Sequence, residues 1–315
     1  MSEESAHGNW YVLIWNLELP TPFVVAPGLT IRPLGAPLTV WDLAAAGAVG
    51  FREWATLEPF ARNIHSEIET AKDAAVLPGY DALNRAWLVC CLLLLRGFGR
   101  SLPVASSAYS WQTVAGHQER TKNVFDEQLA EEGVEAAVDS TRRSLPPFAG
   151  TLLDYHIRIL TCPATSKEIL ADEDAAWIRK HFDRFNALAA SSERFRFALE
   201  AANDFRYSKD ARTAISRLWA GIESLFGISS ELVYRISLMA ASVLQPRGTQ
   251  RRECFRHVKK LYGIRSKAVH GDKISDDRLT EGLNDSFCLL RDLLLAFTVY
   301  GKEYSEEDYE NAIFS

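Results

Sequence analysis

The pattern of hydrophobic and polar positions changes part-way along this chain. Three short runs near the start are rich in β-branched and aromatic residues and are bounded by turn residues, which predicts a small sheet over residues 10–15, 22–26 and 28–33. From about residue 166 onward, apolar residues recur at steps of three and four, which predicts long amphipathic helices. We therefore expect a mostly α-helical protein, in which a smaller α+β domain (residues 1–165) precedes a helical bundle (residues 166–315).

Capping and helix-breaking residues set the bounds of the helices in this second domain. The segment Ser191-Ser192-Glu193 is a candidate N-cap, and Gly227 follows the last apolar position of another helix. The expected helices cover residues 172–188, a stretch from 193 onward, 210–226, a stretch capped by Ser229 and Ser230, 249–269 and 277–300. We expect four or five of them to pack as a bundle.

The first domain is expected to hold helices as well as strands. Residues 38–48, 58–75 and 83–95 are predicted to be helical, as is the polar stretch 122–142, whereas residues 102–111 are predicted to be extended or irregular. The most apolar run, AWLVCCLLLL, is about half the length of a membrane span, so we interpret it as a buried helix.

Net charge, cysteine spacing and the polar start of the chain limit the kinds of protein that this sequence can be. The net charge of -6 argues against a protein that coats nucleic acid without specificity, but it leaves room for a local basic site. The five cysteines are scattered and no pair has the spacing of a zinc site, so neither a metal nor another cofactor is expected. The polar, acidic start of the chain has no signal-peptide pattern, which together with the cysteine usage favours a cytoplasmic protein.

One short stretch carries candidate chemistry. Arg265 and His270 lie close together near the end of a predicted helix, and an arginine can hold a phosphate while a histidine moves a proton near neutral pH. Arg252 and His257 have the same spacing, so spacing alone does not choose between the pairs. Two residues with this spacing point about 140° apart on a straight helix. Gly271 follows His270 directly, and a helix that unwinds there would re-aim the imidazole toward the arginine.

The same region is unusually basic for an acidic protein. Its cations are opposed only by Glu253, and they are Arg247, Arg251, Arg252, Arg256, Lys259, Lys260, Arg265 and Lys267. Such a block is a reasonable electrostatic footprint for a phosphate backbone. The alternative is a solvated helix face that pairs with acids downstream, namely Asp272, Asp276, Asp277 and Glu281.

Three blocks in the second domain resemble a known family. Residues 217–227 (RLWAGIESLFG), 231–238 (ELVYRISL) and 261–271 (LYGIRSKAVHG) are together similar to the Apea-like branch of the HEPN superfamily. The resemblance covers roughly the last 110 to 140 residues. It implies an all-α domain that forms a homodimer, with an R-x(4–6)-H motif from both subunits in a cleft at the interface. Many HEPN proteins are metal-independent ribonucleases of toxin–antitoxin or other antiphage systems.

Within this resemblance, the two motif roles fall on Arg265 and His270. His270 would abstract the 2′-hydroxyl proton or protonate the leaving 5′-oxygen, and Arg265 would stabilise the charge on the phosphorane-like oxygens. The products would be a 2′,3′-cyclic phosphate and a 5′-hydroxyl. The supporting or RNA-binding residues would be Ser266, Lys267, Glu223, Arg256, Lys259 and Lys260.

Two features depart from the family pattern. Active members often carry Asn, Asp or His after the arginine, where this chain has Ser266. Toxins silenced by a partner nucleotidyltransferase carry a tyrosine two residues after the histidine, where this chain has Asp272. Glu223 lies in a matching block, and it either faces the cleft or anchors a basic residue across the bundle.

Two functional hypotheses follow. The first is an endoribonuclease that acts as a toxin or antiphage effector, with RNA as substrate and residues 1–165 as sensor or regulator, open to a regulatory protein partner. The alternative is a catalytically inactive HEPN dimer that serves as an RNA- or protein-binding scaffold. In a third interpretation, the N-terminal half carries the function and the helical half dimerises it.

Overall fold

The structure is a computed structural model that describes residues 8–39, 61–71, 84–115, 150–152, 160, 162, 165–228 and 232–314 of the chain. Two compact units make up the chain, and neither is continuous in sequence. The first comprises residues 1–90, 100–155 and 167–179, and the second comprises residues 91–99, 156–166 and 180–315. Relative to the predicted halves, residues 91–99 and 156–165 belong to the second unit and residues 167–179 to the first.

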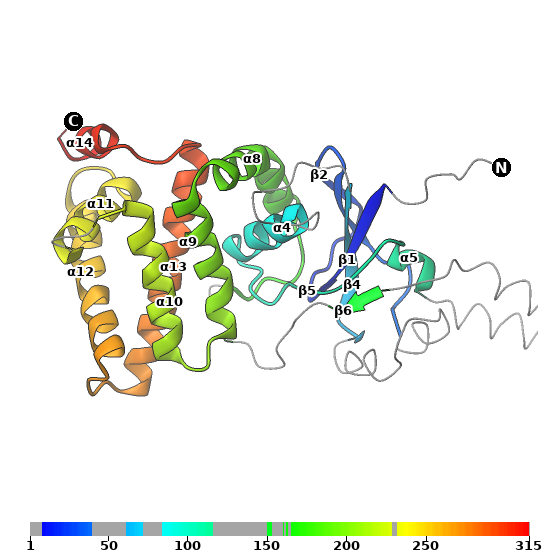
Figure 1. Ribbon diagram of the computed structural model, residues 1–315, viewed down its shortest axis with the longest axis horizontal. Helices are drawn as coiled ribbons and strands as arrows, with labels where there is room; N and C mark the ends of the chain where they lie inside the picture. Colours follow the sequence, from blue (N-terminus) through cyan, green and yellow to red (C-terminus); the bar gives the residue numbers. More distant parts are fainter. Residues whose placement is uncertain are drawn as a thin grey trace, which may run out of the picture. The chain divides into compact units, whose positions relative to one another are not determined.

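The first unit contains an antiparallel sheet (Figure 1). Its strands lie in the order β2-β3-β4-β1-β5-β6. They are β1 (Asn9–Trp15), β2 (Phe23–Ala26), β3 (Leu29–Pro33), β4 (Ile64–Ala71), β5 (Leu102–Ser107) and β6 (Gly150–Leu152). The three predicted strands are confirmed as β1 to β3, and the segment expected to be extended or irregular contains β5.

The helix predicted over residues 58–75 is wrong, because residues 64–71 form the central strand β4. Its side chains alternate in the manner of a strand: Ile64, Ser66, Ile68 and Thr70 are all buried. Both long edges of β4 are hydrogen-bonded, one to β1 and the other to β3. Hydrogen bonding to a strand on each side stabilises β4 by more than the weak helix propensity of its intervening polar residues would stabilise a helix.

One buried carboxylate lies in this sheet. Glu67 is fully buried, and it accepts hydrogen bonds from Arg32 Nη2 (2.6 Å), Ser110 Oγ (2.8 Å) and the backbone N–H of Trp111 (2.8 Å). A buried charge with this many donors is stable as part of the fold. The apolar core beside it includes Leu13, which is fully buried.

The most apolar run of the chain forms the buried helix α4 (Asn84–Leu95), as predicted. A short helix, α5 (Trp111–Val114), follows β5. Among the helices that the structure describes, none is both long and apolar enough to cross a membrane. The predicted helix 122–142 lies outside the described residues, as does 38–48 apart from its first two positions, which are not helical.

Helices dominate the second unit, and most have the bounds that the sequence predicts (Figure 1). They are the latter part of α8 (Asp172–Ser191), then α9 (Glu193–Asp204), the 3-10 turn η2 (Phe205–Tyr207), α10 (Ala211–Phe226), α11 (Leu232–Leu244), α12 (Thr249–His270), α13 (Asp276–Tyr300) and α14 (Glu306–Phe314). The last of these, α14, was not predicted. The observed fold is therefore rich in α-helix, with a small antiparallel sheet in its N-terminal part.

The ends of α9 and α10 follow from capping chemistry. Ser192 Oγ accepts a hydrogen bond from the backbone N–H of Phe195, and Asp210 does the same for Thr213. Gly227 ends α10 with φ +60°, a left-handed conformation that costs glycine little. Ser192 and Gly227 are confirmed as caps, whereas the predicted caps Ser229 and Ser230 lie outside the described residues.

Helix α10 lies against α9, α11, α12 and α13 and forms the centre of the second unit. Leu218, Trp219 and Ile222 on α10 are fully buried. Gly221 allows α10 to lie close to its neighbours: a Cβ at this position would lie 2.7 Å from Cβ of Ala201 on α9 and 3.2 Å from a methyl group of Leu290 on α13. The side chains of α10 are therefore positioned by contacts on several sides.

Candidate functional site

The candidate site lies on α12, which stays helical through His270. Gly271 follows in the left-handed conformation (φ +76°), and its backbone N–H donates to the carbonyl of Lys267. The expectation that the helix unwinds to re-aim His270 toward Arg265 is wrong, because the left-handed residue comes after the histidine. Five positions along a regular helix leave the two side chains pointing about 140° apart.

The end of α12 is held by an arginine from another helix. Arg212 Nη1 donates to the carbonyl of Lys267 (3.1 Å) and lies 3.3 Å from that of Ala268, while its Nη2 donates to the carbonyl of Asp272 (2.9 Å). Carbonyls at a helix end have fewer partners than those in its middle, so this cation adds donors to them and favours the helix dipole. These bonds keep the last turn of α12 wound.

Arg265 is held on the inner side of α12. Its Nη2 lies 3.1 Å from Oε1 of Glu223 on α10, and its guanidinium carbon lies 5.3 Å from the ring centroid of Tyr262. Tyr262 in turn packs edge-on against Trp219, with ring centroids 5.2 Å apart, and Trp219 Nε1 donates to Ser286 Oγ (3.0 Å). A chain of contacts thus positions the guanidinium from α10 and α13.

This ion pair leaves hydrogen-bonding capacity unused. The two charged groups are close, but the N–H of Arg265 is not directed at Oε1, so that oxygen and Arg265 Nε have no hydrogen-bond partner among the described residues. Burial raises the pKa of the Glu223 carboxyl, and the nearby Arg265 only partly counteracts this. Glu223 therefore anchors a basic residue across the bundle, which is one of the two roles expected for it.

His270 lies on the outer side of α12. Its side chain is exposed, and it makes no hydrogen bond, ion pair or ring contact with the residues described here. The buried positions of α12 are Val258, Leu261, Ile264 and Ala268, which point roughly opposite to His270. Arg265 and His270 of one chain do not converge. Ser266 lies between their directions and is half-buried.

The outer side of α12 is strongly basic. At 100° per residue, five exposed cations fall within an arc of about 100° that also contains His270. They are Arg252, Arg256, Lys259, Lys260 and Lys267, here called the α12 basic face. None of them forms an ion pair with a residue in the described ranges, including the acids that follow α12. The face is thus exposed to solvent, as the alternative expects, but among the described residues it does not pair with the acids downstream.

Two arginines of the predicted basic block serve a different purpose. Arg247 Nη2 donates to the carbonyl of Ile313 and Arg251 Nη1 to that of Ala312, each at 2.5 Å. Both carbonyls belong to the last turn of α14 and need donors. These arginines were assigned to the block because the sequence did not predict α14.

Arg252 and His257, the second pair with this spacing, also point in different directions. His257 Nε2 lies 3.8 Å from Oδ2 of Asp285 on α13, away from the α12 basic face that contains Arg252. It therefore offers a control for His270 on the same helix.

A shallow hollow of about 650 Å³ lies beside the end of α12. It is lined by Lys267 of the α12 basic face and by Lys273 and Arg278, which are exposed. Asp272 is an acid among these cations. The positive surface thus continues past His270 toward the start of α13. In the described part of the chain, no group of His, Cys, Asp and Glu side chains is arranged to hold a metal ion.

Comparison with known proteins gives no assignment: the chain matches no protein-family model, no curated protein and no solved structure. The resemblance to HEPN proteins therefore stays a prediction.

The sequence did not identify the residues that support the candidate site. Trp219 and Tyr262 belong to the blocks that resemble the family, but nothing in their spacing indicates that they stack beneath Arg265. Arg212 carries no signal at all, because its partners are backbone carbonyls distant in sequence.

Proposed function

We propose that this protein is a metal-independent endoribonuclease that binds RNA along the α12 basic face and cleaves it with His270 and Arg265. The observation that carries the proposal is the line of exposed cations, unpaired within the described ranges, that leads to an exposed histidine. The helix has 22 residues and is about 33 Å long, so a single strand can contact several cations at once.

The chemistry needs a base, an acid and a group that stabilises the developing phosphorane charge. His270 is accessible to a 2′-hydroxyl or a leaving 5′-oxygen. The Arg265 side chain remains 23% exposed beside Glu223, and a guanidinium suits phosphate oxygens. Because these side chains diverge within one chain, the proposed site combines His270 of one copy with Arg265 of a second copy.

Mixing variants tests this composite site. Purified protein is incubated in EDTA with end-labelled total RNA and tRNA, and we expect cleavage that leaves cyclic-phosphate ends. His270→Ala and Arg265→Ala should each abolish it, whereas His257→Ala should not. Co-refolded His270→Ala and Arg265→Ala should recover about a quarter of the activity, because half the dimers are mixed and each holds one complete site. Recovery near zero would contradict the composite site.

RNA binding is tested separately from cleavage. Replacing Arg256, Lys259 and Lys260 together by alanine should weaken RNA binding and lower the slope of log K against log salt by about 2. A matched control replaces the exposed Lys209, which lies before α10 and outside the α12 basic face. Equal losses in both variants would show that the face has no particular role.

The second candidate function is RNA binding without cleavage. It is favoured by the ion pair that holds Arg265 against Glu223, and by Ser266 at the position after the arginine. Binding that depends on the α12 basic face, with intact RNA in every condition, is the result expected of such a scaffold.

A further inference from the structure

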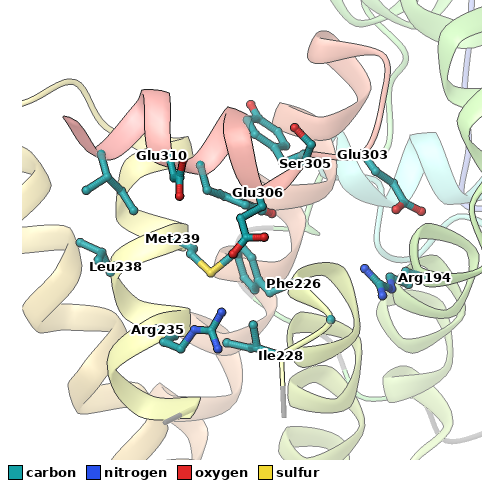
Figure 2. Close-up of a pocket in the computed structure, with 14 residues that line it drawn as sticks. Arg194, Phe226, Ile228, Arg235, Leu238, Met239, Glu303, Ser305, Glu306 and Glu310 are labelled. Carbon is teal, nitrogen blue, oxygen red and sulfur yellow. The ribbon is translucent and has the colours of Figure 1, made fainter. Parts of the chain in front are cut away.

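A second site is formed away from α12, in a cavity of about 590 Å³. It lies among the end of α10, the helix α11, and the segment 303–313 that includes α14 (Figure 2). Its volume is within the range of pockets that hold small organic ligands. The α12 basic face does not contribute to it.

The cavity has an apolar wall with aromatic surfaces. Phe226, Met239 and Tyr309 line it and are buried, and Tyr304 is half-buried beside them. The rings of Tyr304 and Tyr309 are stacked, with centroids 5.4 Å apart, and Phe226 lies 5.9 Å from Tyr309. Such a wall suits a flat ring, and methionine adapts to ligands of varied shape.

One buried polar group in this wall has no partner. Tyr309 is 6% exposed, and its hydroxyl makes no hydrogen bond with any residue in the described part of the chain. Burial raises the pKa of this phenol, so it is a neutral donor at physiological pH. The hydroxyl lies beneath the surface of the wall, so Tyr309 contributes its ring to the cavity.

Charged side chains surround the opening. Arg194 and Arg235 line the cavity and are exposed, and neither forms an ion pair with a described residue. Glu303, Glu306 and Glu310 line it from the segment that carries α14. In Figure 2, the side chains of Glu306, Met239, Phe226 and Arg235 converge on one space. A Cβ at Gly227 would collide with the Arg194 guanidinium, so this glycine lets Arg194 lie across the rim.

We propose that this cavity binds a mononucleotide. A nucleobase offers a flat face for the aromatic wall and N–H donors for the glutamates, while the phosphate suits a guanidinium at the opening, from Arg194 or from Arg235. A fatty acid would leave the glutamates without a partner. The ligand therefore needs an anionic group, a flat ring and hydrogen-bond donors together.

Titration calorimetry of the full-length protein in EDTA tests this site, with AMP, GMP, CMP and UMP as probes and decanoate as the apolar anion. We expect saturable binding of at least one nucleotide. Arg194→Ala with Arg235→Ala should weaken it by about 10- to 100-fold. Because both arginines are exposed, the double variant should fold, which circular dichroism checks. Arg252→Ala on the α12 basic face is the matched control and should bind normally.

Several outcomes would overturn the proposal. They are the absence of nucleotide binding up to about 1 mM by folded wild-type protein, binding that the cavity variants leave unchanged, binding that Arg252→Ala weakens equally, and tighter binding of decanoate than of any nucleotide. None of these results depends on RNA cleavage, so the proposal for the cavity and the proposal for the α12 site are tested independently.

Discussion

The pair Arg265–Glu223 gives the most direct test of how the candidate site is built. At 3.1 Å, two unit charges attract by about 5 kcal/mol at an effective dielectric constant of 20. Desolvation offsets much of this, since each side chain is only 23% exposed and the net effect on Glu223 is a raised pKa. Exposed pairs contribute about 0.5 kcal/mol, and breaking a fully buried pair costs about 3–5 kcal/mol. For this half-buried pair we expect a free-energy cost of breaking it that lies between these two values.

We therefore expect Arg265→Ala to lower the free energy of unfolding by about 2 kcal/mol, because it leaves Glu223 half-buried without a cation. Glu223→Gln should cost less, since the amide needs no counter-charge. A double-mutant cycle, measured by urea unfolding at pH 7, should give a coupling free energy of about 1–2 kcal/mol. Additive effects of the two substitutions would refute the view that Glu223 holds Arg265.

The same pair predicts a pH dependence. The pKa of Glu223 is raised in the folded state. This shift therefore stabilises the fold at a pH below the ordinary pKa of a glutamate, and the stabilisation is lost as the pH rises through the folded-state pKa. Arg265→Ala removes the group that lowers the pKa of Glu223. The loss of folding stability with rising pH should therefore be larger in this variant and should extend to higher pH. Arg265→Ala should thus be most destabilising near neutral pH and least so in mild acid. In the Glu223→Gln background, Arg265→Ala should show the same cost at every pH.

Three further predictions concern the bundle. Gly221→Ala should destabilise the protein by about 1–3 kcal/mol through overpacking. Gly263→Ala in α12, where the added methyl group meets open space, should stabilise the protein by about 0.5–1 kcal/mol. Thermal unfolding of both variants checks these two effects. Asp210→Ala removes the N-cap of α10 and should cost about 1 kcal/mol in urea unfolding, and an unchanged midpoint would contradict the capping role. Arg251→Ala should speed amide hydrogen exchange in α14 without affecting α10, since it removes a donor from the last turn of α14.

Local sequence signals determined much of the helical unit. The three- and four-residue spacing of apolar positions, with Ser192, Asp210 and Gly227 at helix ends, is enough to predict α8 to α10 because these effects act within a few residues. The glutamate in the IESLF block was likewise a recognisable partner for a basic residue. Strand β4 was missed because its buried positions are polar as well as apolar, and its pairing partners lie far away in sequence.

What the sequence left open was the direction of each side chain. The sequence identifies Arg265 and His270 and the cations around them, but α12 could be rotated about its axis without changing its pattern of charges. Only the packing of Val258, Leu261, Ile264 and Ala268 against the rest of the bundle decides that Arg265 faces Glu223 while His270 faces outward. Arg247 and Arg251 similarly bind carbonyls of a helix about 60 residues away. Such contacts depend on positions in space, because a backbone carbonyl looks the same in every residue of the sequence.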